Sequence, residues 1–210
     1  MEKKEKFSFL EGAWIFVIGC FIGFILETVF YVIKYGEFVN KQGLFYGPFK
    51  PIYGFGALLS TAIYYIVKKK TYLRFFLVGT VIGAIFEYVS SWIIETLYHS
   101  YIWDYSSFKY NINGRVYLPY CFAWGLITLV WAKIIYPWFK NKYDKLNLKK
   151  HFKKISIIVA ILIIFDFLIT QVILVKETLC SKNSNFYKIV DKCYPHDTVV
   201  KKFPKFRPIE

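Results

Sequence analysis

Residues 14–33 read WIFVIGCFIGFILETVFYVI. The stretch holds 20 residues, and Glu27 is its only charged side chain. An α-helix needs about 20 consecutive, mostly apolar residues to cross the hydrocarbon core of a bilayer. The stretch therefore predicts a transmembrane helix that carries one carboxyl group inside the membrane.

Four further apolar stretches follow, of which the first is the shortest. The five predicted spans are Trp14–Ile33, Pro51–Val67, Phe75–Leu97, Tyr117–Phe139 and Ile155–Val175. Hydrophobic residues make up 56% of the chain, and their concentration in long runs is typical of membrane helices, not of an amphipathic soluble fold. We expect an all-α integral membrane protein with about five transmembrane helices.

The chain carries a formal net charge of +14, and its lysines fall largely between and after the apolar stretches. In a soluble protein this charge would suggest a nucleic-acid surface, but no nucleic-acid recognition motif accompanies it here. Anionic lipid head groups and membrane topology account for the charge more simply. We therefore expect the lipid bilayer, and no nucleic acid, as the partner of these lysines.

Lysine and arginine are distributed unequally between the two sides of the predicted helices. Basic clusters lie at residues 3–6, 68–74 and 140–154, all on one side, and cytoplasmic segments retain more basic residues. We therefore place the N-terminus in the cytoplasm. The predicted parts are a four-helix membrane core at 14–139, a basic cytoplasmic loop with the fifth helix at 140–175, and a soluble, extracytoplasmic tail at 176–210.

The predicted tail contains Cys180 and Cys193. Outside the cytoplasm these two thiols could form a disulfide, which a cytosolic tail would not keep. The alternative is a pair of unrelated thiols.

The first and third predicted helices share a spaced motif, which reads Gly19-x-x-x-Gly23-x-x-x-Glu27 and Gly79-x-x-x-Gly83-x-x-x-Glu87. A second pair of motifs follows in the next loop and helix, Gly43-x-x-Tyr46 with Gly54 and Gly114-x-x-Tyr117 with Gly125. The first four helices are therefore predicted to form two parallel two-helix repeats, related by an axis along the membrane normal. The alternative is chance, because small-xxx-small patterns are common in membrane helices.

Residues at i, i+4 and i+8 share one broad face of a helix. The motif glycines therefore favour close helix packing and direct both glutamates to the same interface. A charged carboxylate at mid-membrane costs about 2.5–3.5 kcal/mol, so such a residue usually faces a partner, water or a substrate path. The alternative is a protonated glutamate that is satisfied by a hydroxyl such as that of Tyr64 or Ser60.

Polar and aromatic residues beyond the glutamates extend the predicted site. Ser90, Ser91 and Glu95 continue from Glu87 toward the outer surface. The loop before the second helix is rich in glycine and proline, and it either starts that helix at Pro51 or lines a cavity as a broken helix. The substrate-path candidates are Glu27, Glu87, Glu95, Tyr53, Trp103, Asp104, Tyr105 and Asn111.

Together these motifs resemble those of a known family. The shared set is Gly-x-x-x-Glu, Tyr46-Gly47-Pro48, Pro51-Ile52-Tyr53-Gly54-x-Gly56, Glu87 with Glu95, Trp103-Asp104-Tyr105-Ser106, Asn111-x-x-Gly114 and Phe122-Ala123-Trp124-Gly125. Over residues 14–139 the set is similar to that of the bacterial ABC-transporter type IV permeases, which are small multi-pass membrane proteins. The resemblance implies a permease in the bacterial plasma membrane that works with a separate cytoplasmic ATP-binding subunit.

The fifth predicted helix and the tail lie outside this resemblance, and we expect them to be additions to the core. Asp166 lies near the centre of the fifth helix. A carboxyl group at that position would dock the helix onto the core.

The sequence contains no GxxxxGK[ST] P-loop, so ATP hydrolysis would have to come from a partner. It also contains no metal-ligand motif and no nucleophile elbow, and its three histidines lie near or beyond helix ends. We therefore expect no metal or cofactor. A permease or transport component is favoured over a membrane-embedded enzyme acting on a lipid-linked substrate, and a non-catalytic membrane partner or sensor is the third interpretation.

Overall fold

A computed structural model describes residues 7–67, 71–204 and 207–208. The lysines at positions 3, 4, 6 and 68–70, which contribute to the predicted topology, lie outside the described residues. The helices are α1 (Phe9–Tyr35), α2 (Pro51–Ile66), α3 (Tyr72–Tyr98), α4 (Leu118–Val130), α5 (Tyr136–Asn147), α6 (Lys150–Leu179), α7 (Asn185–Cys193) and α8 (His196–Lys202). The short strands are β1 (Ser100–Tyr101), β2 (Asn111–Ile112), β3 (Val116–Tyr117) and β4 (Arg207–Pro208).

Among the described residues, four helices are long and apolar enough to cross a membrane, namely α1, α3, α6 and the helix that runs from Leu118 to Asn147. In this last helix, one turn of π-helix (Trp131–Ile135) joins α4 to α5. The apolar helix α2 has only 16 residues, which at about 1.5 Å per residue gives about 24 Å. The predicted all-helical membrane fold is confirmed at this level.

Caps and prolines fix several helix ends. Ser8 and Thr71 accept hydrogen bonds from the backbone N–H groups of Glu11 and Arg74 and so cap α1 and α3. Pro51 is the first residue of α2, which confirms the interpretation of the preceding loop as a turn that starts this helix.

The basic segment at residues 140–154, predicted as a loop, is helical except at Leu148 and Lys149. The fourth predicted span therefore does not end at Phe139 but continues as α5 to Asn147, and α6 begins at Lys150. Lysine is a good helix former, so its charge ends the apolar stretch without ending the helix.

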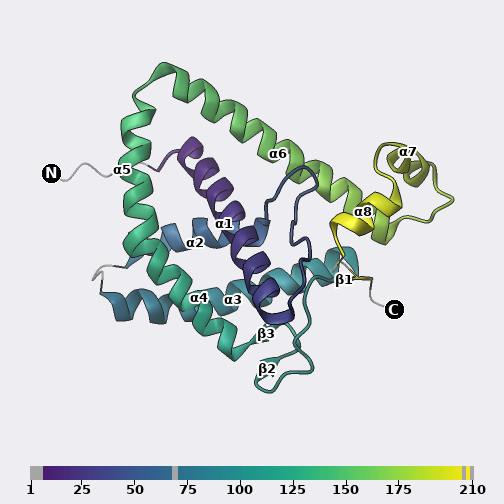
Figure 1. The fold of residues 1–210 in the computed structure, drawn as a ribbon, viewed down its shortest axis with the longest axis horizontal. Coiled ribbons are helices and arrows are strands. Elements are labelled where there is room, and N and C mark those ends of the chain that lie inside the picture. Colours follow the sequence, from purple (N-terminus) through teal and green to yellow (C-terminus); the bar gives the residue numbers. More distant parts are fainter. Residues whose placement is uncertain (1–6, 68–70, 205–206, 209–210) are drawn as a thin grey trace.

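The helices α1 to α4 pack as two hairpins, α1 with α2 and α3 with α4 (Figure 1). The motif glycines lie at both contacts. A Cβ at Gly23 would lie 2.1 Å from the Tyr53 ring, and one at Gly83 would lie 2.4 Å from the Cβ of Trp124. Gly19 and Gly79 likewise face Ala57 and Thr128. In both hairpins, the backbone at these glycines therefore lies closer to the side chains of the facing helix than a residue larger than glycine would permit.

Two polar side chains of α6 contact the loop that precedes α2. The backbone N–H of Tyr46 donates to Asp166 over 3.0 Å, and that of Phe45 donates to Thr170 over 3.0 Å. Asp166 thus docks α6 onto the first hairpin, as expected.

The tail folds over the end of the bundle where α1 and α3 finish. Strand β4 pairs antiparallel with β1, and Phe45, Ile173 and Val199 form a buried cluster between loop, α6 and tail. Figure 1 shows α7 and α8 beside the end of α6 and near β1. We call this end of the bundle the loop end; it contains residues 36–50, residues 99–117 and the tail. We call the opposite end, which contains the turn between α5 and α6, the corner end.

A fully buried lysine fastens the tail to α6. Lys176 donates to Asp191 over 2.7 Å and to the carbonyl oxygen of Tyr194 over 2.9 Å. The hydrogen bond from Lys176 lowers the pKa of the Asp191 carboxyl below its ordinary value. A 2.9 Å hydrogen bond to the hydroxyl of Tyr46 raises the pKa of Tyr194 to about 12, so the Tyr194 phenol stays protonated at neutral pH.

Val199→Asp is expected to release the tail. Val199 is 3% exposed, so the new carboxylate would be buried without a partner. Loss of the buried valine and burial of the charge should together destabilise docking by more than about 2 kcal/mol. The measurement is the rate of proteolysis beyond residue 180 in the purified protein.

Val200→Asp is the matched control, because the neighbouring Val200 is 51% exposed. Its tail should stay as protected as in the unchanged protein. Equal protection in the two variants would contradict the docked arrangement.

Candidate functional site

Glu87 is a buried carboxyl group in the apolar helix α3. The residue is 5% exposed. Its oxygens accept hydrogen bonds from the hydroxyl of Tyr105 over 3.0 Å and from Nε1 of Trp124 over 3.1 Å. Ser60, one of the hydroxyls considered from the sequence, instead pairs with Thr128 over 3.2 Å.

Tyr105 reaches Glu87 from the loop between β1 and β2. Its ring packs against the rings of Tyr120, Tyr117 and Phe108, with centroid distances of 5.3, 6.1 and 6.3 Å. Burial, reinforced by the charge of Glu87, raises the pKa of the Tyr105 phenol above its ordinary value. The phenol therefore stays protonated and serves as a donor to the carboxyl group.

Trp124 connects the second hairpin to the first. Its indole covers Gly83 and stacks on Tyr53 of α2, with ring centroids 5.9 Å apart and an interplanar angle of 28°. A Cβ at Gly56 would lie 2.7 Å from the Trp124 ring, so this glycine leaves the space that the ring occupies. The stack places Tyr53 next to the residue that donates to Glu87.

Glu27 has a different environment from Glu87. It forms an ion pair with Lys50, the residue that precedes α2, and 26% of its side chain is exposed. The two motifs give both glutamates the same spacing from their glycines. The fold nevertheless supplies a cation to Glu27 and two neutral donors to Glu87.

A small polar cavity, which we call the loop pocket, lies at the loop end beside the Glu87 cluster. It measures about 70 Å³ and is lined by Ser91, Glu95, Tyr101, Trp103, Asp104, Ser106, Asn113, Gly114 and Arg115. Ser91 follows Glu87 by about one turn of α3, so the loop pocket lies next to the buried carboxyl group along this helix.

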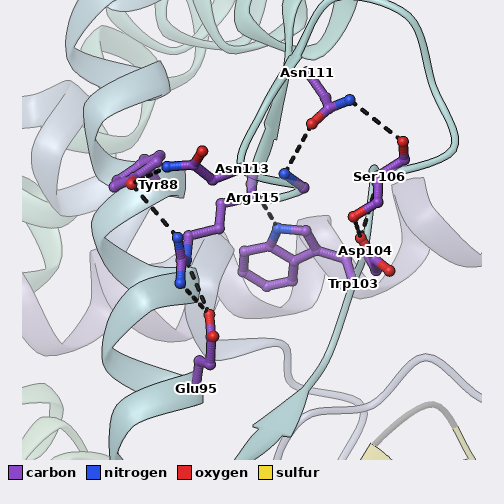
Figure 2. Close-up of polar contacts among 9 residues, drawn as sticks. Tyr88, Glu95, Trp103, Asp104, Ser106, Asn111, Asn113 and Arg115 are labelled. Atoms are coloured by element: carbon purple, nitrogen blue, oxygen red, sulfur yellow. Dashed lines mark hydrogen bonds and ion pairs between the residues drawn. The ribbon is translucent and has the colours of Figure 1, made fainter. Parts of the chain in front are cut away.

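Arg115 organises one wall of the loop pocket. It forms an ion pair with Glu95, and its guanidinium lies 5.4 Å from the centre of the Tyr88 ring. Trp103 donates its Nε1–H to the backbone carbonyl of Arg115 over 3.0 Å. Figure 2 shows the guanidinium between Tyr88 and Glu95, with the Trp103 indole beside it.

Asp104 and Asn111 shape the backbone of the loop. Asp104 accepts hydrogen bonds from the N–H and the hydroxyl of Ser106, over 2.9 and 2.6 Å. Asn111 accepts from the N–H of Gly114 over 2.8 Å and donates to the carbonyl of Phe108 over 2.7 Å. Gly114 has a φ of +67°, which glycine adopts without strain. Asp104 also lines the loop pocket, whereas Asn111 does not line it and bonds only to loop backbone, including the carbonyl of Ser106.

The structure therefore divides the predicted path residues into groups. Glu95, Trp103 and Asp104 meet in the loop pocket, and Glu87, Tyr105 and Tyr53 form the buried cluster around Trp124. Glu27 lies with Lys50 on the first hairpin, and Asn111 belongs to the turn before β3.

A family model described as "Putative ABC-transporter type IV" matches residues 14–171. The chain belongs to this family. With its long apolar helices, this ABC-transporter type IV family member is a membrane protein. No curated protein and no solved structure matches it.

The region matched by the ABC-transporter type IV family extends into α6 and includes Asp166 and Thr170. The prediction that the fifth helix lies outside the family resemblance was therefore wrong. An apolar helix with few polar landmarks offers little sequence signal of its own. The tail from residue 176 lies beyond the matched region, as expected.

One buried carboxyl group of this family member had no signal in the sequence. Glu11 is 1% exposed and accepts hydrogen bonds from Lys140 over 3.0 Å and from the hydroxyl of Tyr136 over 3.2 Å. Tyr136 also pairs with the hydroxyl of Tyr65 on α2. Glu11 precedes the first apolar stretch and resembles an ordinary interfacial charge, so hydropathy gives no reason to single it out.

Cys180 and Cys193 lie at the ends of α6 and α7. Both are free thiols, the first partly buried and the second exposed. The disulfide between them stays a prediction.

Tyr105→Phe is expected to destabilise the ABC-transporter type IV chain, because it leaves one oxygen of the buried Glu87 without its donor. The loss should be about 1–3 kcal/mol. It is measured as the midpoint shift of thermal unfolding in detergent. Tyr110→Phe is the control, since Tyr110 is an exposed residue of the same loop. A midpoint for Tyr105→Phe that equals that of the control would disprove the role of the hydrogen bond.

Gly83→Ala tests the approach of α3 to α4. Alanine stabilises an exposed helix by about 1 kcal/mol relative to glycine. At Gly83, however, the new Cβ would lie 2.4 Å from the Cβ of Trp124 and would displace the indole from Glu87. We expect a net loss of about 1–3 kcal/mol in thermal unfolding.

Gly12→Ala is the control for this substitution, because its tightest new contact, at 3.2 Å, would be with the far end of the exposed Phe7 ring, and Leu58 would lie at an ordinary 3.8 Å. Its stability should be unchanged or increased. A gain in stability for Gly83→Ala as well would show that the α3–α4 contact tolerates a side chain.

Proposed function

We propose that this chain is the membrane component of a bacterial transporter and works with a separate cytoplasmic ATP-binding subunit. The substrate interacts with the Glu87 cluster, and the loop pocket gives this cluster a polar route to the loop end. The observation that carries the proposal is Glu87 itself, an acid buried within an apolar helix and bonded to a residue of the outer loop.

A carboxyl group at this depth is unfavourable in hydrocarbon and is by default a functional residue. A purely structural acid would need no route to water. Glu87, however, is followed on α3 by Ser91 and Glu95, and both of these residues line the loop pocket. Tyr105, which donates to Glu87, stands in the sequence between the pocket residues Asp104 and Ser106, so movement of this loop would open Glu87 to the pocket.

The proposal includes the two-helix repeat. Tyr53 directly precedes Gly54, and Trp124 directly precedes Gly125, so these two residues correspond in the repeat. Tyr65 and Tyr136 follow them at equal spacing and therefore correspond as well. Each corresponding pair is in contact, the first as a ring stack and the second as a hydrogen bond between hydroxyls. A repeat axis that runs along the bundle between α2 and α4 would bring corresponding residues into contact at both of these levels.

Five crossings form part of the same proposal. The loops after α1 and after α3 both contact the tail, through Lys202 with the carbonyl of Phe45 and through β4 with β1. Both loops therefore lie at the loop end. For this, α2 would have to carry the chain back from the loop end to the opposite end before α3 begins, although α2 has only 16 residues. The loop end would face outward and the basic corner end the cytoplasm, in agreement with the distribution of lysine and arginine.

The experiment uses the native host with its own gene deleted and complemented. Cells and medium are compared by untargeted mass spectrometry for strains that carry the unchanged chain, Glu87→Gln or Glu37→Gln. We expect at least one metabolite to be redistributed between cells and medium on deletion. The unchanged chain and Glu37→Gln, a control at an exposed residue, should restore its distribution, whereas Glu87→Gln at equal abundance in the membrane should not.

A metabolite whose total amount changes, with no change in its distribution, would favour the membrane-embedded enzyme instead. If the Glu87→Gln strain fully restores the normal distribution of that metabolite, the role given to Glu87 is contradicted. Purification of the cross-linked complex tests the partner, and an ATP-binding protein should be recovered with the chain.

A further inference from the structure

A second cavity, which we call the lateral groove, lies between α1, α2 and α4 and measures about 240 Å³. One side is formed by α1 with Ile22 and Leu26, the other by α4 with Ile127 and Val130, and Gly56 and Ala57 of α2 form the floor. Figure 1 shows α1 and α4 on the near side of the bundle with α2 behind them.

The lining of the lateral groove offers water almost no partners. Among its polar side-chain groups, the Ser60 hydroxyl pairs with Thr128, and the indole N–H groups of Trp124 and Trp131 donate to Glu87 and Thr61. The remaining polar side chain is Tyr53, whose ring is stacked on Trp124. A buried water needs two to four polar partners, whereas apolar cavities of about 150 Å³ stay dry and admit benzene-sized molecules. A groove of this size and chemistry therefore selects a hydrocarbon ligand.

The lateral groove opens toward lipid. Leu26 and Leu126 stand at its edges and are exposed, and both belong to helices long and apolar enough to cross the membrane. The medium that meets these edges is hydrocarbon, so an alkyl chain can enter from the side without crossing water.

The lateral groove adjoins the Glu87 cluster. Trp124 lines the groove with its ring and donates its Nε1–H to Glu87. Tyr53 also lines the groove beside Trp124, and Gly23 lies next to it, one helical turn before Glu27. A ligand with its chain in the groove would therefore have its other end beside the polar residues of the site.

From this geometry we infer that the substrate is an amphipathic molecule with a single alkyl chain, which binds in the lateral groove with its polar group beside Tyr53, Trp124 and Glu87. The inference rests on the proposed transport function and narrows its substrate class. It also gives the stack of Tyr53 on Trp124 a role, since this stack separates the apolar chain site from the acid.

The test is photolabelling with a diazirine-bearing stearic acid in vesicles of phosphatidylethanolamine and phosphatidylglycerol, followed by mapping of the labelled residues. Bulk lipid reaches the exposed surface of every span, so labels there carry no information. Gly56, Ala57 and Ser60 are buried, and a chain reaches them only through the groove. We expect these floor residues to be labelled.

Val130→Trp should block the groove from its edge and reduce floor labelling about tenfold, which corresponds to a loss of about 1.4 kcal/mol in binding. Ile134→Trp is the control, because Ile134 is 64% exposed on the same continuous helix and does not line the groove. Thermal unfolding of both variants confirms that they are folded.

Floor labelling that is absent, or unchanged in Val130→Trp, would overturn the inference. Equal floor labelling by a diazirine-bearing diacyl phospholipid would assign the groove to bulk lipid and would overturn it as well. The assay needs neither ATP nor a partner, so its failure is distinguishable from failure of the transport proposal.

Discussion

The buried carboxyl group of Glu87 is the constraint on which much of this structure depends. Hydrocarbon offers no hydrogen-bond donor, so the protein has to bring donors to the acid. It does so from two elements that are distant in sequence, Tyr105 of a loop and Trp124 of α4. The loop must therefore fold back onto the bundle, and α4 must approach α3 closely enough for an indole to span the gap. Gly83 and Gly56 provide that space, Gly83 near the Cβ and Cγ of Trp124 and Gly56 at the far end of its ring.

The difference between the hairpins follows from the same constraint. In the first hairpin, Lys50 directly precedes α2 and satisfies Glu27 as an ion pair. In the second hairpin, Cys121 occupies the corresponding position before Gly125, and a thiol supplies no charge. The longer second loop compensates by supplying a neutral donor. A neutral donor holds the acid in either protonation state, whereas a lysine would fix it as the anion. The second hairpin is thus the one suited to a change in the charge of its glutamate.

Much of the helical architecture could be predicted because it depends on local composition. Apolar length located the membrane helices, and the spacing of Gly19, Gly23, Gly79 and Gly83 identified the faces that pack. The partners of Glu87 could not be predicted, since the contact with Tyr105 depends on the path of an irregular loop. Glu11 was missed for a related reason, because its donors Lys140 and Tyr136 lie more than a hundred residues away. Hydropathy reports how polar a position is but not which distant group reaches it.

The contacts between the hairpins indicate where the bundle could open. At the corner end, Tyr65 pairs with Tyr136, and the buried Glu11 binds Tyr136 and Lys140, so α1, α2 and α5 are joined by partly buried polar bonds. At the loop end, the tail connects the loops of both hairpins. Between these ends, α1 and α4 are separated by the lateral groove. There the hairpins meet through the stack of Tyr53 on Trp124 and through two buried hydrogen bonds, Ser60 with Thr128 and Trp131 with Thr61. Hydrogen bonds among buried groups are costly to leave unmade, whereas the stack joins its two rings without a hydrogen bond between them. A ligand that enters the groove therefore acts on the contact between the hairpins that is easiest to rearrange, and that contact includes the donor to Glu87.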